Sequence, residues 1–383
     1  MRKERHQHAF TSLRLCTLCV FVGLAFSWVS LAHWLQLSPE VVSTNPRQIN
    51  QQAANDDDPY PEGAPPVIGI REDVVTAGRT TEIVYATTSA STGQDIALLL
   101  HGCSHSALKF FSPSPSCSTC IGLSEEMQIA RILVEQPSIA VVLAVTSQDR
   151  KSGCWGQQDT AHVQDAVEYI WKQVLELQTP QQPQHGRLWA FGASSGGRFA
   201  AQLAVEGIVQ GAMVGVMSLG SALIKKWMQQ SQPPIYLAPM PRDKRTLQGT
   251  LQDYSDMTRI NNQNNLHKHA ILDTDTCTPF PVTAVYLHQR VPHMTLIMAQ
   301  QIVTELQTSG HMDATTGMLL KDPTKSDWRD ILKATCGGEC LHNQPLGPGV
   351  SPLAKALHRA WAFHEYCSEA TLKALDFFHN AVS

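Results

Sequence analysis

Apolar runs alternate with helical patterns along most of the chain. Because such runs also occur in buried helices, their order and the glycines beside them decide in favour of strands. Continuous apolar strands that alternate with helices are typical of a parallel sheet covered on both faces. The first two predicted strands, at residues 67–70 and 82–87, are predicted to pair as a β-hairpin. Strands are predicted at residues 67–70, 82–87, 96–100, 139–145, 188–191, 213–219 and 235–237, and helices at 160–177 and 199–205.

The regular alternation ends at about residue 253. From there to residue 359 the pattern is broken by proline, glycine, cysteine and an Asn-rich stretch at 261–265. We expect residues 67–383 to form one α/β domain, and residues 253–359 to form a cap-like insertion in it.

The N-terminus predicts a membrane-directed segment. Arg2, Lys3 and Arg5 precede an uncharged, apolar stretch of 18 residues at 15–32. This stretch is just long enough to span a bilayer, although a cleaved signal peptide also fits, because Ser30-Leu31-Ala32 resembles a cleavage site. Residues 1–37 are therefore interpreted as a signal-anchor or signal peptide, and the polar residues 38–66 as a stalk. Basic residues before the stretch place the rest of the chain in the lumen or outside the cell, membrane-held or secreted.

Cysteine usage agrees with that compartment. Two of the ten cysteines, Cys16 and Cys19, lie in the apolar stretch, and the even number that remains favours disulfides in a translocated protein. We expect at least one bridge that ties the 103–120 loop to itself or to Cys154. A zinc site built from Cys117, Cys120, Cys336 and Cys340 is the alternative.

Composition sets limits on the partners. A hydrophobic content of 43% supports a large core, and a net charge of −4 gives no electrostatic reason to expect nucleic acid. The sequence predicts neither a cofactor nor a resident metal, and it does not reveal the oligomeric state.

One short motif carries the strongest chemical signal. Residues Gly192-Ala193-Ser194-Ser195-Gly196 follow a predicted strand and precede a predicted helix. This is the strand–turn–helix context of the G-x-S-x-G nucleophile elbow in α/β-hydrolases, where small neighbours allow a sharp turn that exposes the serine hydroxyl. Ser194 is the predicted nucleophile. A glycine-rich turn that only packs helix against strand is the structural alternative.

Two backbone N–H groups are candidates for an oxyanion hole. The strand at 96–100 ends in His101-Gly102-Cys103, the place where this fold presents its second oxyanion donor. The predicted donors are the N–H groups of Cys103 and Ser195.

The acid and the base follow from chain order. In this fold they follow the serine as Asp or Glu and then His, so Asp243, just after the strand at 235–237, is the predicted acid. Asp273 and Asp275 are its rivals. His364 is the predicted base, because an imidazole suits proton transfer from serine at neutral pH. Its rivals are His288, His293, His311 and His358.

A series of landmarks follows in fixed order along the chain: His101-Gly102-Cys103-Ser104-His105, residues 117–126, Cys154-Trp155, Met240-Pro241-Arg242-Asp243, Cys277 with Pro281-Val282-Thr283, the stretch from Asp313 through Gly317 to Trp328, and His364-Glu365. In this order they are similar to an uncharacterised α/β-hydrolase family of plants and algae. The resemblance extends from about residue 97 to 378. It implies an α/β-hydrolase fold and supports Asp243 and His364 as acid and base, but it implies no defined substrate. Tyr366 departs from the pattern, since methionine usually follows His-Glu in the family.

These features together predict an enzyme. We expect a serine hydrolase that acts by acyl transfer through Ser194, Asp243 and His364 on a carboxylic ester, either small or linked to lipid or polysaccharide. A serine peptidase is the enzymatic alternative. A catalytically inactive hydrolase fold that serves as a lumenal interaction module is the alternative from another class.

Overall fold

The computed structural model describes residues 67–382 except positions 77, 89–92, 150, 176–185, 231, 265–268, 336–340, 342–344 and 348, and for 260–264 it describes the backbone alone. The predicted anchor, the predicted stalk, Cys336 and Cys340 lie outside these residues. Within them, no helix combines the length and the apolar character needed to cross a bilayer.

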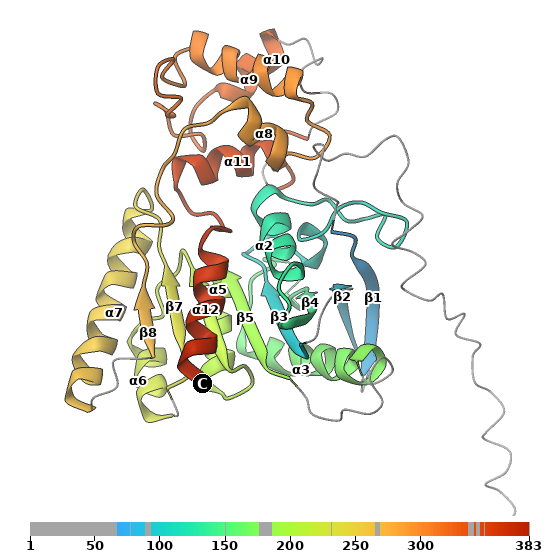
Figure 1. The fold of residues 1–383 in the computed structure, drawn as a ribbon, viewed down its shortest axis with the longest axis vertical. Coiled ribbons are helices and arrows are strands. Elements are labelled where there is room, and N and C mark those ends of the chain that lie inside the picture. Colours follow the sequence, from blue (N-terminus) through green and yellow to red (C-terminus); the bar gives the residue numbers. More distant parts are fainter. Residues whose placement is uncertain are drawn as a thin grey trace, which may run out of the picture. The chain divides into compact units, whose positions relative to one another are not determined.

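A single mostly parallel sheet forms the core of the described chain (Figure 1). Its eight strands follow the order β1-β2-β4-β3-β5-β6-β7-β8. The β1–β2 and β2–β4 pairs are antiparallel and the remaining pairs are parallel. The predicted α/β-hydrolase fold is therefore confirmed. The strands are β1 (Ile70–Thr76), β2 (Arg79–Thr87), β3 (Asp95–Leu100), β4 (Ile139–Val145), β5 (Leu188–Ala193), β6 (Gly211–Gly215), β7 (Ile235–Ala238) and β8 (Ala270–Leu272).

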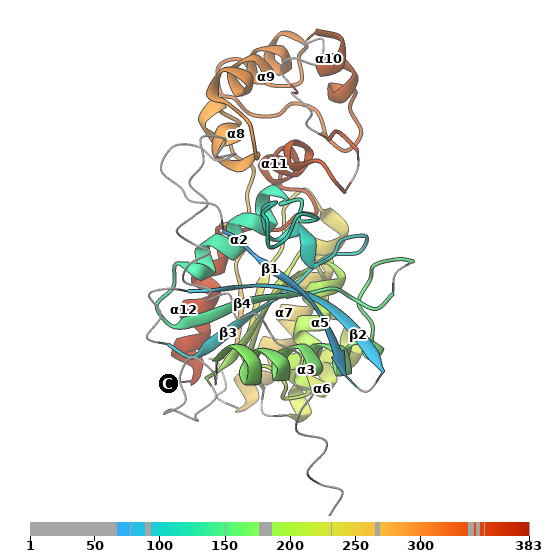
Figure 2. The same ribbon diagram turned by 90° about the vertical axis from the view of Figure 1, so that its right-hand side faces the viewer.

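Alternate residues of each central strand serve opposite faces of the sheet. In β3, Ala97 and Leu99 pack towards α2 (Ser124–Val134) and α12 (Ala370–Val382). Ile96, Leu98 and Leu100 pack towards the other face, which several helices cover (Figure 2). Burial on both faces explains why these strands read as continuous apolar runs. The helices of the second face are α3 (Thr160–Tyr169), its π-helical continuation η3 (Ile170–Leu175), α5 (Ser195–Val205), α6 (Ser221–Gln229) and α7 (Lys244–Asn264).

The first strand differs from its predicted position. Pairing begins only at Ile70, opposite Tyr85, and continues through the charged residues Arg71, Glu72 and Asp73. These residues lie on an edge strand that solvent reaches, so charged side chains are tolerated there. Because of these charges, the strand cannot be recognised as an apolar run in the sequence. Two short 3₁₀ helices, η1 (Ala107–Lys109) and η2 (Gln157–Asp159), lie in loops.

Four helices pack around an apolar cluster of their own, separate from those of the sheet, and we call these helices the cap. Insertion was predicted from residue 253, but the structure places residues 253–264 in α7 and residues 270–272 in β8 of the sheet domain. The polar composition of α7 and the shortness of β8 explain the difference. The cap comprises α8 (Ala284–Arg290), α9 (Leu296–Thr308), α10 (Trp328–Thr335) and α11 (Pro352–Trp361) (Figure 1).

Ion pairs, one of them with a completely buried carboxylate, fasten the cap to the sheet domain. Arg290 of α8 lies 2.6 Å from Glu125 of α2 and 3.1 Å from Glu369, which Arg359 of α11 also binds at 3.0 Å. The Glu125 side chain is completely buried, and the Ser368 hydroxyl donates a further hydrogen bond to it. A buried carboxylate is tolerated only while such partners remain.

Removing Arg290 is therefore expected to destabilise the protein strongly. Arg290→Met leaves Glu125 buried without its counter-charge, which should lower the free energy of unfolding by about 3–5 kcal/mol. Urea denaturation measures this. Arg259→Met is the matched control, because its pair with Asp256 is exposed and contributes at most about 1 kcal/mol. Adding Glu125→Gln to Arg290→Met should restore part of the loss. Equal losses in the two single variants would contradict the argument.

Candidate active site

Ser194 occupies a sharp turn between β5 and α5. Its backbone has φ 54° and ψ −125°, a conformation that residues other than glycine rarely adopt. The Ser194 N–H donates to the Gly215 carbonyl at 2.9 Å, which ties the turn to the end of β6. A Cβ atom at Gly192 would come within 2.3 Å of the Gly196 carbonyl, and one at Gly196 within 2.1 Å of the Leu100 carbonyl. The two glycines of the motif are therefore sterically required.

The structure brings Asp243 and His364 to this serine. His364 Nε2 lies 3.1 Å from Ser194 Oγ, and His364 Nδ1 lies 2.6 Å from Asp243 Oδ2. Asp243 follows β7, and the Thr246 N–H also donates to it at 3.3 Å. Burial raises the pKa of Asp243, but the hydrogen bonds from His364 and Thr246 outweigh it, so the pKa falls below its usual value. An ionised Asp243 keeps the proton on Nδ1 and leaves Nε2 able to accept a proton from Ser194.

The rival residues serve other contacts. Asp273, at the end of β8, accepts hydrogen bonds from the Thr276 and Tyr236 hydroxyls, and its Oδ1 accepts from the Asp275 N–H at 3.1 Å. The four rival histidines belong to the cap segment. Among them, His311 lies 2.9 Å from Asp327, and His288 bonds the Met294 carbonyl.

The Gly102–Cys103 peptide lies beside the serine. Two donors hold the Gly102 carbonyl oxygen: His101 Nδ1–H at 2.7 Å and the His105 N–H at 3.3 Å. In a trans peptide the C=O and the following N–H point in opposite directions, so these bonds also fix the direction of the Cys103 N–H. The Ser195 N–H, in the first turn of α5, has no partner within its helix. Cys103 and Ser195 therefore remain the predicted oxyanion donors.

The buried side chain of His101 anchors the loop that carries the Gly102–Cys103 peptide. Its ring is fully buried, its Nε2 accepts from the Ser147 N–H at 3.1 Å, and it packs on Trp155 with centroids 5.0 Å apart. Trp155 Nε1–H in turn donates to the His101 carbonyl at 2.8 Å. Burial lowers the pKa of His101 to about 4, so the ring is neutral near pH 7. His101 belongs to the predicted oxyanion motif, but its sequence context gave no sign of this anchoring role.

Disulfides brace the same loop. Cys103 is joined to Cys154 and Cys117 to Cys120, which confirms the expected bridge from the 103–120 loop. Cysteines that are joined to each other offer no thiolate to a metal, so this pairing counts against the zinc alternative. A third bridge, between Cys277 and Cys367, was not predicted.

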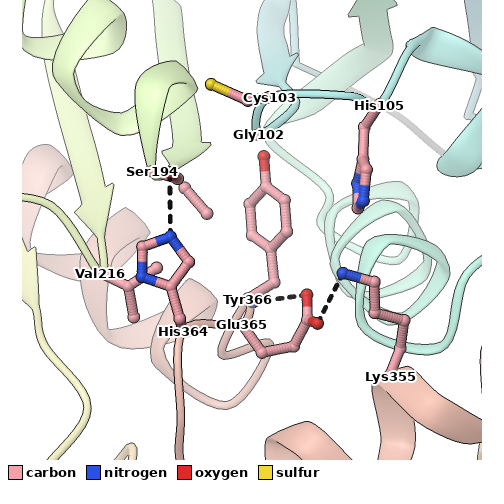
Figure 3. A pocket seen from close by; sticks show the side chains of 10 residues that line it. Gly102, Cys103, His105, Ser194, Val216, Lys355, His364, Glu365 and Tyr366 are labelled. Atoms are coloured by element: carbon pink, nitrogen blue, oxygen red, sulfur yellow. Dashed lines mark hydrogen bonds and ion pairs between the residues drawn. The ribbon is translucent and has the colours of Figure 1, made fainter. Parts of the chain in front are cut away.

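A cavity of about 130 Å³ opens at the serine (Figure 3). Ser194 and His364 lie at one side of it, and His105 and Lys355 lie at the other, with Tyr366 between them. The sequence analysis did not identify Lys355 or Glu365 as site residues, because neither belongs to a motif with a known role. The lining residues are Gly102, Cys103, His105, Ala193, Ser194, Val216, Lys355, His364, Glu365 and Tyr366.

Each of the five residues after His364 is bound to another segment of the molecule. Residues 364–369, which we call the histidine segment, connect α11 of the cap to α12. Glu365 Oε2 lies 2.8 Å from Lys355 Nζ, and the Tyr366 hydroxyl donates to the Leu100 carbonyl at the end of β3. Cys367, Ser368 and Glu369 are held by Cys277, Glu125 and Arg359 respectively.

Among known proteins, only solved structures show similarity to this chain. No protein-family model matches the sequence, and no curated protein matches it. A cold-adapted esterase from an Arctic intertidal metagenomic library is 17% identical, with a TM-score of 0.34 over 58% of this chain and 92% of that one. A dienelactone hydrolase from Anabaena variabilis is 16% identical, with a TM-score of 0.35 over 63% and 97%.

A third similar structure is an α/β serine hydrolase homologue from Coxiella burnetii, 12% identical, with a TM-score of 0.33 over 61% of this chain and 94% of that one. At such identities and TM-scores the likeness carries no argument about activity. The resemblance to the plant and algal family stays a prediction, and the case for function rests on the geometry of the site.

The buried His101 predicts a specific pH dependence of stability. Its pKa is about 4 when folded and about 6.5 when unfolded, so between these values the unfolded chain binds more protons. The stability that neutral His101 contributes is therefore complete above pH 6.5 and is lost as the pH falls to 4. The loss amounts to about 3 kcal/mol, at about 1.4 kcal/mol per pKa unit.

His101→Gln should remove this part of the pH dependence. The pKa of His358 is likewise lowered by burial, to about 3, so the test compares wild type with variant rather than reading one curve. Urea denaturation from pH 7 to pH 4 gives both curves. The variant should lose about 3 kcal/mol less than wild type across this range, and parallel curves would show that His101 does not titrate as argued.

Proposed function

We propose that this protein is a serine hydrolase that cleaves a carboxylic ester. The observation that carries the proposal is the chain of contacts from Ser194 Oγ through His364 to Asp243, at 3.1 Å and 2.6 Å. A nucleophile bonded to a base that a third group orients is the arrangement that activates a serine hydroxyl.

The proposed reaction is acyl transfer to water. Ser194 Oγ attacks the ester carbonyl carbon while His364 Nε2 takes the hydroxyl proton, and the N–H groups of Cys103 and Ser195 stabilise the resulting oxyanion. The intermediate collapses, and the alcohol leaves with the proton from His364. Water then attacks the acyl-enzyme with the same assistance and releases the acid. Every step uses groups of this chain.

An ester is favoured over an amide because an alkoxide is a better leaving group than an amine and needs less help from the acid. A serine peptidase is the alternative enzyme. An inactive interaction module would not require Ser194, His364 and Asp243 to keep their mutual hydrogen bonds, whereas the strained turn at Ser194 persists only where its surroundings enforce it.

The test of the nucleophile compares two neighbouring serines. Ser194→Ala should abolish labelling by a fluorophosphonate probe and lower ester hydrolysis by a factor on the order of 10⁴ or more. Ser195→Ala is the matched control, because the proposal assigns Ser195 a backbone N–H and no role for its hydroxyl. It should keep most of the labelling. Circular dichroism checks that both variants are folded, and labelling that survives Ser194→Ala would refute the proposal.

We further propose that the hydrolase domain lies in the lumen or outside the cell, tethered by residues 15–32 or released after their cleavage. The three disulfides of the described residues support an oxidising compartment.

Peptide mapping under non-reducing conditions tests this location. In protein isolated from its own cells with thiols blocked at lysis, Cys103–Cys154, Cys117–Cys120 and Cys277–Cys367 should be recovered as linked peptides. The same protein expressed in a reducing cytosol is the control and should show alkylated thiols. Free alkylation of these six cysteines in the native protein would place the domain in a reducing compartment.

A further inference from the structure

Lys355 is an unusual residue for the wall of a small cavity. It lies on α11, its side chain is 13% exposed, and it lines the cavity beside Ser194 (Figure 3). An ammonium group removed from water is costly, and replacing a buried ion pair by apolar residues of similar size often stabilises a protein. Packing alone therefore gives no reason for a lysine here.

Lys355 and His105 each pair with a carboxylate that is more deeply buried than the basic group. Glu365 and Glu126 have side chains that are 3% and 0% exposed, whereas Lys355 and His105 are 13% and 10% exposed. Lys355 Nζ lies 2.8 Å from Glu365, and His105 Nδ1 lies 2.9 Å from Glu126. Lys355, His105 and Glu365 line the cavity, whereas Glu126 is not among its lining residues.

These contacts leave nitrogen atoms of Lys355 and His105 that can still form hydrogen bonds. An ammonium group has three N–H donors, and the pair with Glu365 uses one. His105 keeps Nε2, which becomes a second donor when the ring is protonated. Burial lowers the pKa of Lys355, but Glu365 and Glu126 outweigh it and raise the pKa, so the ammonium stays charged.

Lys355 therefore has N–H donors that can face a ligand in the cavity. We propose that the site takes esters that carry a free carboxylate, bound by Lys355 with His105 beside it, while Ser194 attacks the ester carbonyl. The proposal rests on the serine hydrolase function proposed above.

Matched pairs of substrates test the charge preference. Monomethyl malonate, succinate and glutarate are compared with their dimethyl esters, and O-acetylglycolate with its methyl ester, so that the carboxylate lies on the acid or on the alcohol part. Wild type should favour the charged member of at least one pair in kcat/KM. Lys355→Gln should lower that ratio about ten- to a hundredfold, the usual contribution of a hydrogen bond to a charged group.

A structural role for Lys355 makes a different prediction. If its pair with Glu365 only holds the histidine segment in place, both members of a pair lose activity equally and the ratio stays constant. Lys355→Gln combined with Glu365→Gln avoids an unpaired buried carboxylate and should show the same fall in ratio. Lys225→Gln, at an exposed position on α6, is the control and should leave the ratio unchanged.

A binding measurement separates this proposal from the proposed function. Calorimetry with Ser194→Ala should detect glutarate binding that weakens about tenfold or more when Lys355→Gln is added. If the wild type cleaves no ester and takes no fluorophosphonate label, the hydrolase function fails, but glutarate binding can still be measured. Wild type that never favours the charged ester, or glutarate binding that does not depend on Lys355, would overturn the carboxylate proposal.

Discussion

The position of His364 is the constraint on which the site depends. This residue lies in a connection between two helices, with φ 42°, yet its two ring nitrogens must meet Asp243 and Ser194 within hydrogen-bonding distance. Such a backbone conformation persists only if its surroundings hold it. The bonds made by the rest of the histidine segment do so, and those of Glu365 and Glu369 lead to α11 of the cap. Packing of the cap and alignment of the proposed base are therefore coupled.

The end of β3 is the point where the parts of the site meet. The Leu100 carbonyl accepts from the Tyr366 hydroxyl, and Gly196 approaches the same carbonyl so closely that a side chain would not fit. The proposed oxyanion loop begins at the next residue, His101, whose ring fixes the Gly102 carbonyl. The serine turn, the histidine segment and the oxyanion loop thus share one fixed strand end. The rigid sheet therefore provides one common anchor for these three parts, in addition to the bonds that tie the histidine segment to the cap.

The buried strands and the turn at Ser194 could be predicted, because each is determined by a short stretch of sequence. Buried strands read as apolar runs, and the turn at Ser194 demands its glycines, so both can be recognised within a few residues. The charged edge strand β1, the start of the cap and the bond between Lys355 and Glu365 could not be predicted. These depend on which segments pack together, and periodicity along one segment contains no such information. Chain order favoured Asp243 over Asp273, and the structure separates them by what each contacts.

Tyr366 lies between the proposed catalytic residues and the basic side chains of the cavity. A methionine here could fill the same space but could not donate a hydrogen bond to the Leu100 carbonyl. In this chain the phenol ring is part of the cavity wall, between Ser194 on one side and His105 and Lys355 on the other (Figure 3). A ring fixed at its hydroxyl end cannot swing aside as a flexible thioether can. In the binding mode proposed above, the group that carries the carboxylate would lie against this fixed ring.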